Sequence, residues 1–194
     1  LQRDGDAEQQ LAAATTAVDL VRVHELLAAG ADPNKMVDVD GHWQSPWFLA
    51  LYQVRSRRPD MVEIVRVMLK AGANPESVWG TSTGAIKTSF WKSLTGPSRK
   101  AGSGEDSTLH VAMLHPVPDV VRAILASGFN PRHGEAELVM AIEAGDIEIA
   151  HMLVDAGVDV NSHAGANTPL VAAIEARNVP LMIYLEDHGA REKP

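Results

Sequence analysis

The chain has 194 residues, of which 45% are hydrophobic and 22% charged, a composition typical of a folded globular protein. Because 25 acidic residues outnumber 17 basic ones, the formal net charge is −8, which excludes nucleic acid as the expected main ligand. The absence of cysteine excludes disulfides, thiolate zinc sites and a cysteine nucleophile, and no apolar run approaches the about 18 residues of a membrane span.

In chain order, the first recurring element is a short motif that contains a glycine. In four of its five copies an Asp or Asn stands two residues after this glycine. It is clearest at residues 26–34 and again at 153–161. Glycine suits the left-handed residue just past a helix C-terminus, and Asp or Asn with Pro suits the turn that follows. The motif therefore predicts five helix ends, at Gly30, Gly72, Gly128, Gly157 and Gly189.

A second motif precedes each glycine and ends in alanine, as in residues 45–50 and 168–173. Its Ser-Pro or Thr-Pro start suits a helix N-cap and first turn. From this alanine to the glycine the separation is 16 residues in four copies and 22 in the second. Two short helices cannot bury their own apolar faces, so each pair must stack on a neighbour. The sequence thus predicts five stacked helix pairs, at about residues 7–38, 39–78, 79–134, 135–163 and 164–194.

The Thr-Pro-Leu-His-x-Ala type start and the Leu-Leu-x-x-Gly-Ala-Asp-x-Asn type end resemble ankyrin repeats, whose period is about 33 residues. The resemblance implies an all-α fold, an ankyrin-repeat solenoid of stacked helix-turn-helix units with hairpin loops, forming a single domain over residues 1–194. It also implies a non-catalytic protein that binds other proteins through its hairpin tips and first helices. We expect a monomer when the chain is free.

Insertions in repeat proteins map to loops on one face, and this chain has two. The second helix pair carries six extra residues near residues 53–59, and the 80–104 insertion exceeds the family spacing by about 23 residues. The 80–104 insertion holds four basic residues and no acidic one, and residues 85–94 within it are predicted to form a short helix. Three interpretations are open. The insertion packs on the acidic surface of the rest of the chain, or it is a loop without a function, or it binds an acidic patch on a partner, which is the interpretation that we favour.

Seven of the nine aromatic residues lie between residues 43 and 91. Trp47 and Phe48 occupy positions that the resemblance places in the core, and Trp43 maps to a hairpin tip. Trp and Tyr are common interface anchors, and the acidic members of the expected surface suggest a partner with a basic rim. The expected partner-binding residues are Trp43, Gln44, Tyr52, Trp79, Lys87, Phe90, Trp91, Lys92, Asp106, His115, Glu135, Glu143, Asn167 and Glu175.

Short catalytic patterns occur, but each lacks its companions. Residues 80–84 match the letters of a nucleophile elbow and residues 89–92 match a Ser-x-x-Lys pattern, without the sheet or motifs that either needs. Residues 38–41 resemble part of a calcium loop but lack its later ligands, and the turn of a hairpin is the preferred interpretation. No catalytic residue, metal or cofactor is therefore predicted, and an enzyme that uses Ser82 or Ser89 is the remote alternative.

The leading functional hypothesis is a bacterial-type immunity or inhibitor protein that neutralises an enzyme, such as an effector or a hydrolase, with its concave face and the 80–104 insertion. The alternative is an adaptor that joins two proteins. No membrane insertion is expected. The chain begins at Leu1 without an initiator methionine, which suggests a removed export signal and a periplasmic location, with the cytoplasm as the alternative.

Overall fold

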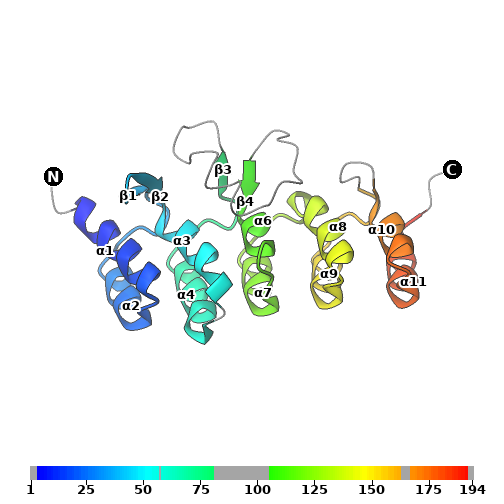
Figure 1. The fold of residues 1–194 in the computed structure, drawn as a ribbon, viewed down its shortest axis with the longest axis horizontal. Helices are drawn as coiled ribbons and strands as arrows, with labels where there is room; N and C mark the ends of the chain where they lie inside the picture. The colour runs from blue at the N-terminus through cyan, green and yellow to red at the C-terminus, as the bar shows by residue number, and fades with distance from the viewer. Residues whose placement is uncertain (1–3, 57, 81–104, 163–166, 192–194) are drawn as a thin grey trace. The chain divides into compact units, whose positions relative to one another are not determined.

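The computed structural model describes residues 4–56, 58–80, 105–162 and 167–191 (Figure 1). These residues form ten α-helices, two short 3-10 helices and two two-stranded antiparallel sheets, which confirms the predicted all-α class. The chain divides into two compact units, Leu1–Ala123 and Ile124–Pro194. The boundary falls inside a helix, and one continuous array over residues 1–194 stays a prediction.

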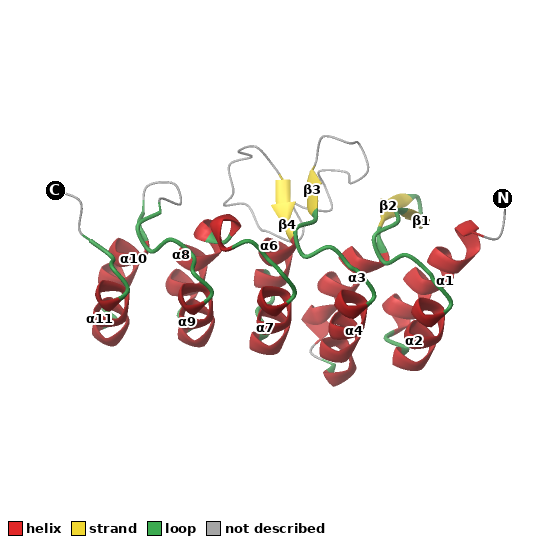
Figure 2. Cartoon of the chain, turned by 180° about the vertical axis from the view of Figure 1, so that it is seen from behind, coloured by secondary structure: helices red, strands yellow, loops and turns green. Residues whose placement is uncertain are grey.

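In the first unit, α1, α3 and α6 form one row of helices, with α2 and α4 beside it (Figure 1). α3 packs on α1, α4 and α6, and α2 packs on α1 and α4. Two hairpins, β1–β2 and β3–β4, project from the side of the α1–α3–α6 row (Figure 2). The elements are α1 (Asp4–Ala17), α2 (Leu20–Ala28), β1 (Val37–Val39), β2 (His42–Gln44), α3 (Pro46–Gln53), η1 (Val54–Ser56), α4 (Pro59–Lys70), β3 (Val78–Gly80), β4 (Glu105–Ser107), α6 (Thr108–Met113) and α7 (Pro118–Ala126), which crosses the boundary.

The second unit contains two further helix pairs. α8 packs on α9, α10 packs on α11, and α8 and α10 pack on each other. The elements are η3 (Pro131–His133), α8 (Glu135–Ala144), α9 (Ile147–Asp155), α10 (Pro169–Glu175) and α11 (Val179–Asp187).

The hydroxyl residues of the alanine motif cap the first helices as predicted. Ser45 Oγ accepts the Phe48 amide at 3.1 Å, and Thr168 Oγ1 accepts the Val171 amide at 3.3 Å. Proline follows both caps, where the first helical turn needs no amide donor. Pro180 lies in the first turn of α11, where proline is compatible with a helix.

The five predicted helix-ending glycines all adopt the left-handed conformation, with φ between 92° and 98°. The loop after each of the first four begins with an Asp or Asn whose side chain accepts the amide two residues further on. This turn holds the chain in register as it leaves the helix. The acceptors are Asp32, Asn74, Asn130 and Asp159, at 2.8, 2.9, 3.2 and 2.9 Å.

Two asparagines join the loop of one helix pair to the loop of the next. Asn34 Nδ2 donates to the Gly72 carbonyl at 2.8 Å, and its Oδ1 accepts the Asn74 amide at 2.8 Å. Asn161 makes the same two bonds in the second unit, to the Gly189 carbonyl and from the Arg191 amide, each at 3.0 Å. The Asn of the glycine motif thus fixes the spacing of neighbouring pairs within each unit.

The core lies between the helices of each pair and between neighbouring first helices. Trp47 and Phe48 are fully buried, which confirms their predicted core role. Three residues of the 53–59 segment form η1, and Val54 of this turn is buried. Among the described helices, none combines the length and the apolar character needed to cross a bilayer.

Replacing Asn161 by alanine removes both loop-to-loop bonds, and we expect the free energy of unfolding to fall by about 1–2 kcal/mol. The measurement is urea unfolding followed by circular dichroism. Asn167→Ala is the matched control in the same unit, because the Asn167 side chain makes only long contacts of 3.4 Å, and we expect a change below about 0.5 kcal/mol. Equal losses in the two variants would contradict the structural role of Asn161.

Candidate partner-binding surface

The first hairpin turns at Asp40 and Gly41, both with positive φ (53° and 81°). Asp38 Oδ1 accepts the Gly41 amide at 2.7 Å, which closes the turn. An Asp-Gly pair suits the two-residue turn of a β-hairpin because its backbone twist matches that of the strands. The structure thus confirms that residues 38–41 form a hairpin turn.

The hairpin is anchored to the helix row by one of its two faces. Val37 packs in a buried cluster with Ala12 of α1 and Leu49 of α3, and Val39 packs against the same cluster. Gln9 Nε2 of α1 also donates to the Asp38 carbonyl at 2.6 Å. These contacts position the hairpin relative to α1 and α3.

Trp43 and Gln44, both predicted to contact a partner, lie on opposite faces of strand β2. Trp43 pairs with Asp38 across the hairpin and is 55% exposed. Gln44 pairs with the buried Val37 and is only 8% exposed. Since side chains alternate along a strand, two consecutive residues cannot share the outer face. The expectation that Gln44 lies on the surface is therefore wrong, and Trp43 is the surface residue of the two. A contact of Gln44 with a partner stays a prediction.

A shallow groove of about 430 Å³ lies between α1 and the hairpin. Small side chains on α1, including Ala13 and Ala17, leave this space open beside the Asp40 turn. The groove is not predicted from the sequence, although the run of alanines at residues 12–14 is a signal for it. Its lining residues are Gln9, Ala12, Ala13, Thr16, Ala17, Val39 and Asp40.

Tyr52, expected on the exposed side of a first helix, is half-buried near the end of α3. Its ring stacks on Phe48, with 6.4 Å between centroids and 7° between planes. The Arg55 guanidinium carbon lies 4.2 Å from the Tyr52 centroid. A cation over an aromatic face is a stabilising contact, so Tyr52 is partly engaged within the fold.

The second hairpin brackets the 80–104 insertion. Trp79 in β3 and Asp106 in β4 are direct partners in the antiparallel register, so two of the predicted residues are brought together at the base of the insertion. Lys87, Phe90, Trp91 and Lys92 lie outside the described residues, as do Ser82 and Ser89 and the predicted helix at 85–94.

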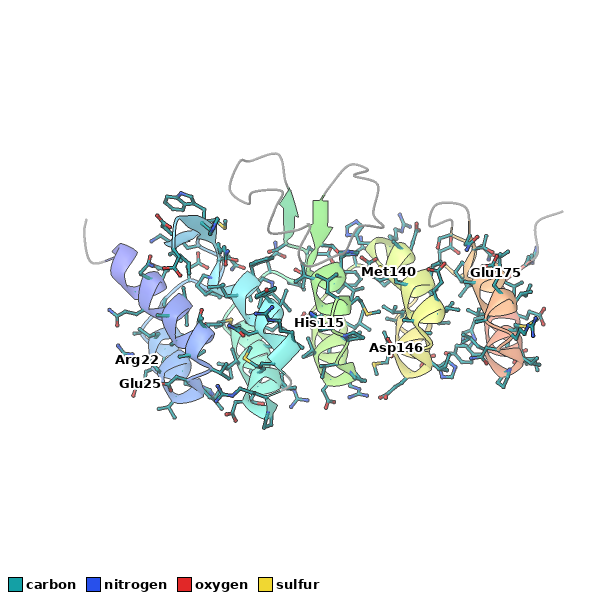
Figure 3. All side chains as sticks on the ribbon, viewed as in Figure 1. Arg22, Glu25, His115, Met140, Asp146 and Glu175 are labelled. Carbon is teal, nitrogen blue, oxygen red and sulfur yellow. The ribbon has the colours of Figure 1, made fainter. Side chains whose placement is uncertain are left out.

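The second unit brings three predicted residues together. Asn167 Nδ2 lies 3.4 Å from Glu143 Oε1 at the end of α8 and 3.4 Å from Glu175 Oε2 at the end of α10. The Glu175 side chain is labelled in Figure 3. Packing of α8 on α10 explains why residues from separate segments meet. The result is an exposed pair of carboxylates linked by an amide, which we call the acidic bridge.

The two remaining predicted residues are not part of these groups. His115 is exposed just after α6, as Figure 3 shows. Glu135 is half-buried at the first position of α8, where a carboxylate is favoured by the helix dipole. Stabilisation of helix α8 is thus sufficient to explain a glutamate at position 135.

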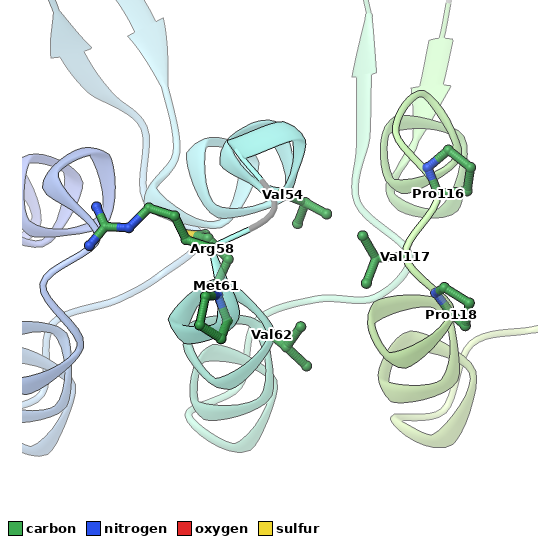
Figure 4. Close-up of a pocket in the computed structure, with 8 residues that line it drawn as sticks. Val54, Arg58, Met61, Val62, Pro116, Val117 and Pro118 are labelled. Atoms are coloured by element: carbon green, nitrogen blue, oxygen red, sulfur yellow. The ribbon is translucent and has the colours of Figure 1, made fainter.

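A second cavity in the first unit, of about 350 Å³, lies between the α3–α4 and α6–α7 connections (Figure 4). Val54, Val62 and Val117 point into it, and prolines form much of its rim. Arg58 also lines the cavity but directs its guanidinium away, donating to the Ala17 carbonyl at 3.3 Å. The cavity is apolar and holds no arrangement for bond-making chemistry.

Tyr184 has the most perturbed environment in the second unit. Its hydroxyl donates to Asp155 Oδ1 at 2.5 Å, and its ring lies between the rings of His151 and His188, with centroids 4.1 and 4.2 Å away. Burial, followed by the hydrogen bond to Asp155 and its negative charge, raises the pKa of Tyr184 to about 12. A tyrosine of raised pKa stays protonated at neutral pH and is a poor general base. Over the described part of the chain, no group of three or more His, Asp or Glu residues could hold a metal ion.

No protein-family model matches the chain, and no curated protein is significantly similar to it.

The raised pKa of Tyr184 predicts how the stability of the second unit depends on pH. Because the folded-state pKa exceeds the ordinary value of 10, the contribution of Tyr184 to stability is complete below pH 10 and is lost as pH rises towards 12. In Tyr52→Phe, where Tyr184 is the remaining tyrosine, the ultraviolet absorbance of tyrosinate should titrate with a midpoint of about 12.

Asp155→Asn, added to that variant, should lower the midpoint, because it removes the neighbouring charge that opposes ionisation. A midpoint at the ordinary value in both proteins would contradict the Tyr184–Asp155 contact.

Proposed function

We propose that this chain is an ankyrin-type repeat protein that acts by binding another protein and not by catalysis. The observation that carries the proposal is the first hairpin, which is anchored by Val37 and holds the Trp43 side chain in solvent. A large aromatic side chain fixed on a supported strand loses little conformational freedom on binding. Such residues are the commonest interface anchors. The repeated helix pairs with left-handed glycine ends support the family assignment.

The specific function that we propose is inhibition of a partner enzyme, as in bacterial-type immunity proteins. The partner would meet Trp43 and the 80–104 insertion, whose base, β3–β4, projects from the same side of the helix row as the first hairpin (Figure 2). The insertion carries four positive charges in an acidic chain, so it is suited to an acidic cleft.

An adaptor is the second candidate, and the acidic bridge is the observation that favours it. Glu143 and Glu175 lie in the second unit, whereas the hairpin lies in the first, so the chain has two chemically different surfaces. An apolar and basic surface and an acidic surface would select different partners.

Trp43→Ala should weaken partner binding by roughly thirtyfold or more, the effect of losing an interface anchor worth about 2 kcal/mol. The fold should be retained because Trp43 is exposed. The partner is captured from the native source with the full chain and identified. Its dissociation constants for the wild type and the variants are then measured by calorimetry. Val21→Ala, which truncates an exposed side chain on α2, is the control and should bind as the wild type does.

Deletion of residues 81–104 separates the candidate functions. An inhibitor should lose both binding and inhibition of its enzyme, whereas an adaptor should keep its partners and respond to Glu143→Gln and Glu175→Gln instead. Equal affinities of Trp43→Ala and Val21→Ala would refute the hairpin as the binding element. Turnover that is lost on Ser82→Ala or Ser89→Ala would establish the enzyme alternative.

A further inference from the structure

The outer face of the first hairpin places an exposed aromatic ring beside carboxylates. Asp38 and Trp43 are direct partners in the antiparallel register, and both are exposed. Residues directly opposite each other in such a pair have Cβ atoms about 4.5–5.5 Å apart, so the Asp38 carboxylate lies beside the indole. Asp40 is exposed at the turn, and Met36, which is 39% exposed, precedes the first strand. This face therefore offers apolar surface and negative charge within reach of one side chain.

No described group neutralises these carboxylates. Asp38 uses Oδ1 to accept the Gly41 amide at 2.7 Å, and its Oδ2 has no partner in the described part of the chain. The Asp40 carboxylate makes no hydrogen bond or ion pair with a described residue. Lys35, the lysine or arginine nearest to them in the sequence, pairs with the buried Glu8 at 3.2 Å. The hairpin thus presents negative charge for which the described residues supply no cation.

The Trp43 ring is also open to a partner. Within the ranges that the structure describes, no aromatic or cationic group packs on this ring, whereas the ring of Tyr52 is stacked on Phe48 and lies under the Arg55 guanidinium. The strand that carries Trp43 is held in place because Val37, on the opposite face of the hairpin, packs in the buried cluster. An exposed indole on a supported strand is preorganised to receive another group.

A guanidinium matches an indole beside a carboxylate. An arginine side chain is planar and weakly hydrated, so it can stack on the face of a tryptophan while the N–H groups at its edge donate to a carboxylate. A lysine ammonium is a strongly hydrated point charge and gains less from the same surface. Trp43 and Asp38 can therefore contact the face and the edge of one arginine, and Asp40 adds a second negative charge.

The register of the second hairpin repeats this pairing. Trp79 of β3 lies opposite Asp106 of β4 at the middle of three paired positions, as Asp38 and Trp43 do in the first hairpin. The two hairpins precede α3 and α6, which pack on each other, and both project from the same side of the helix row (Figure 2). The same pair of residue types thus stands at two neighbouring places along one side of the row.

We propose that the first hairpin recognises an arginine side chain of the partner. The indole of Trp43 stacks on the guanidinium, Asp38 accepts from its N–H groups, and Asp40 supplies further negative charge. This inference rests on the proposed function and names the chemistry of the partner surface. The partner carries this arginine at the rim of the acidic cleft that receives the 80–104 insertion, so the hairpin and the insertion each meet opposite charge.

The first test titrates capped tetra-arginine and tetra-lysine peptides into the full chain at equal ionic strength. Binding is followed by NMR on the indole N–H signal of Trp43, which is assigned by its loss in Trp43→Phe. The arginine peptide should shift this signal and bind at least about threefold more tightly than the lysine peptide, because only arginine can stack and donate at once. Equal affinities of the two peptides, or no shift with about 10 mM arginine peptide, would overturn the proposal.

The second test removes the charges and keeps the hairpin. In Asp38→Asn combined with Asp40→Asn, asparagine still offers an oxygen to the Gly41 amide and tolerates the positive φ at position 40. This double variant should bind the arginine peptide roughly fivefold more weakly. Asp19→Asn combined with Asp60→Asn removes the same two charges at the starts of α2 and α4, and should change the affinity less than about twofold. Equal losses in the two folded double variants, checked by circular dichroism, would overturn the proposal.

Deletion of residues 81–104 tests whether the chain's own basic insertion is the occupant. The deletion should raise the affinity for the arginine peptide less than about tenfold, since it removes only the repulsion between the insertion and the peptide. A larger gain would show that the insertion competes for the hairpin and would overturn the assignment to a partner.

The captured partner separates this inference from the proposed function. The Asp38 and Asp40 double variant should bind the partner at least about fivefold more weakly than the Asp19 and Asp60 double variant does. If Trp43→Ala weakens this binding and the Asp38 and Asp40 variant does not, the hairpin is the binding element but recognises no arginine, and only this inference fails. If Trp43→Ala binds the partner as the wild type does, the proposed function fails even where the peptide result stands.

Discussion

The structure depends on burial that no helix pair can complete alone. Counted from the first residue of the alanine motif, the fourth and seventh positions are buried in the first four pairs and exposed in the last. Such stacking makes stability a sum of interactions between neighbours. The loop asparagines act at the same junctions, since Asn34 and Asn161 each bond the backbone of the next loop at two points. Apolar packing supplies the attraction, and these directional bonds fix the spacing.

The candidate binding surface follows from the alternation of side chains along a strand. Because Val37 and Gln44 face the helices, Asp38 and Trp43 must face solvent. The hairpin is therefore held by residues different from those that it presents. A change at Trp43 alters the surface without removing the contacts of Val37 with Ala12 and Leu49. The residues that hold the hairpin in place are thus distinct from the residue that we propose contacts a partner.

The repeated helix pairs could be predicted from the sequence because the residues that begin and end each helix act locally. A left-handed glycine, a hydroxyl cap and an Asp or Asn turn each act over two to four residues, so their signals survive without knowledge of the neighbours. The core roles of Trp47 and Phe48 were predicted from the resemblance to ankyrin repeats and are confirmed. The first hairpin turn was predicted from its Asp-Gly pair for the same reason.

The misplaced and missed features depend on register or on neighbours. Gln44 was placed on the surface because the motif located the hairpin but not the phase of its alternation. The α1 groove arises where small side chains meet a hairpin, which requires the packing of two elements. The acidic bridge forms from residues on α8, α10 and the loop between the pairs. Each of them was predicted singly, but their contact depends on the packing of α8 on α10.

The same reasoning explains why the exposure of Val171 and Ile174 is not predicted from the sequence. Val171 and Ile174 are ordinary residues for their motif positions, and the equivalent Val139 and Ile142 are buried. What distinguishes them is the absence of a described helix packed on them, a property of the neighbourhood.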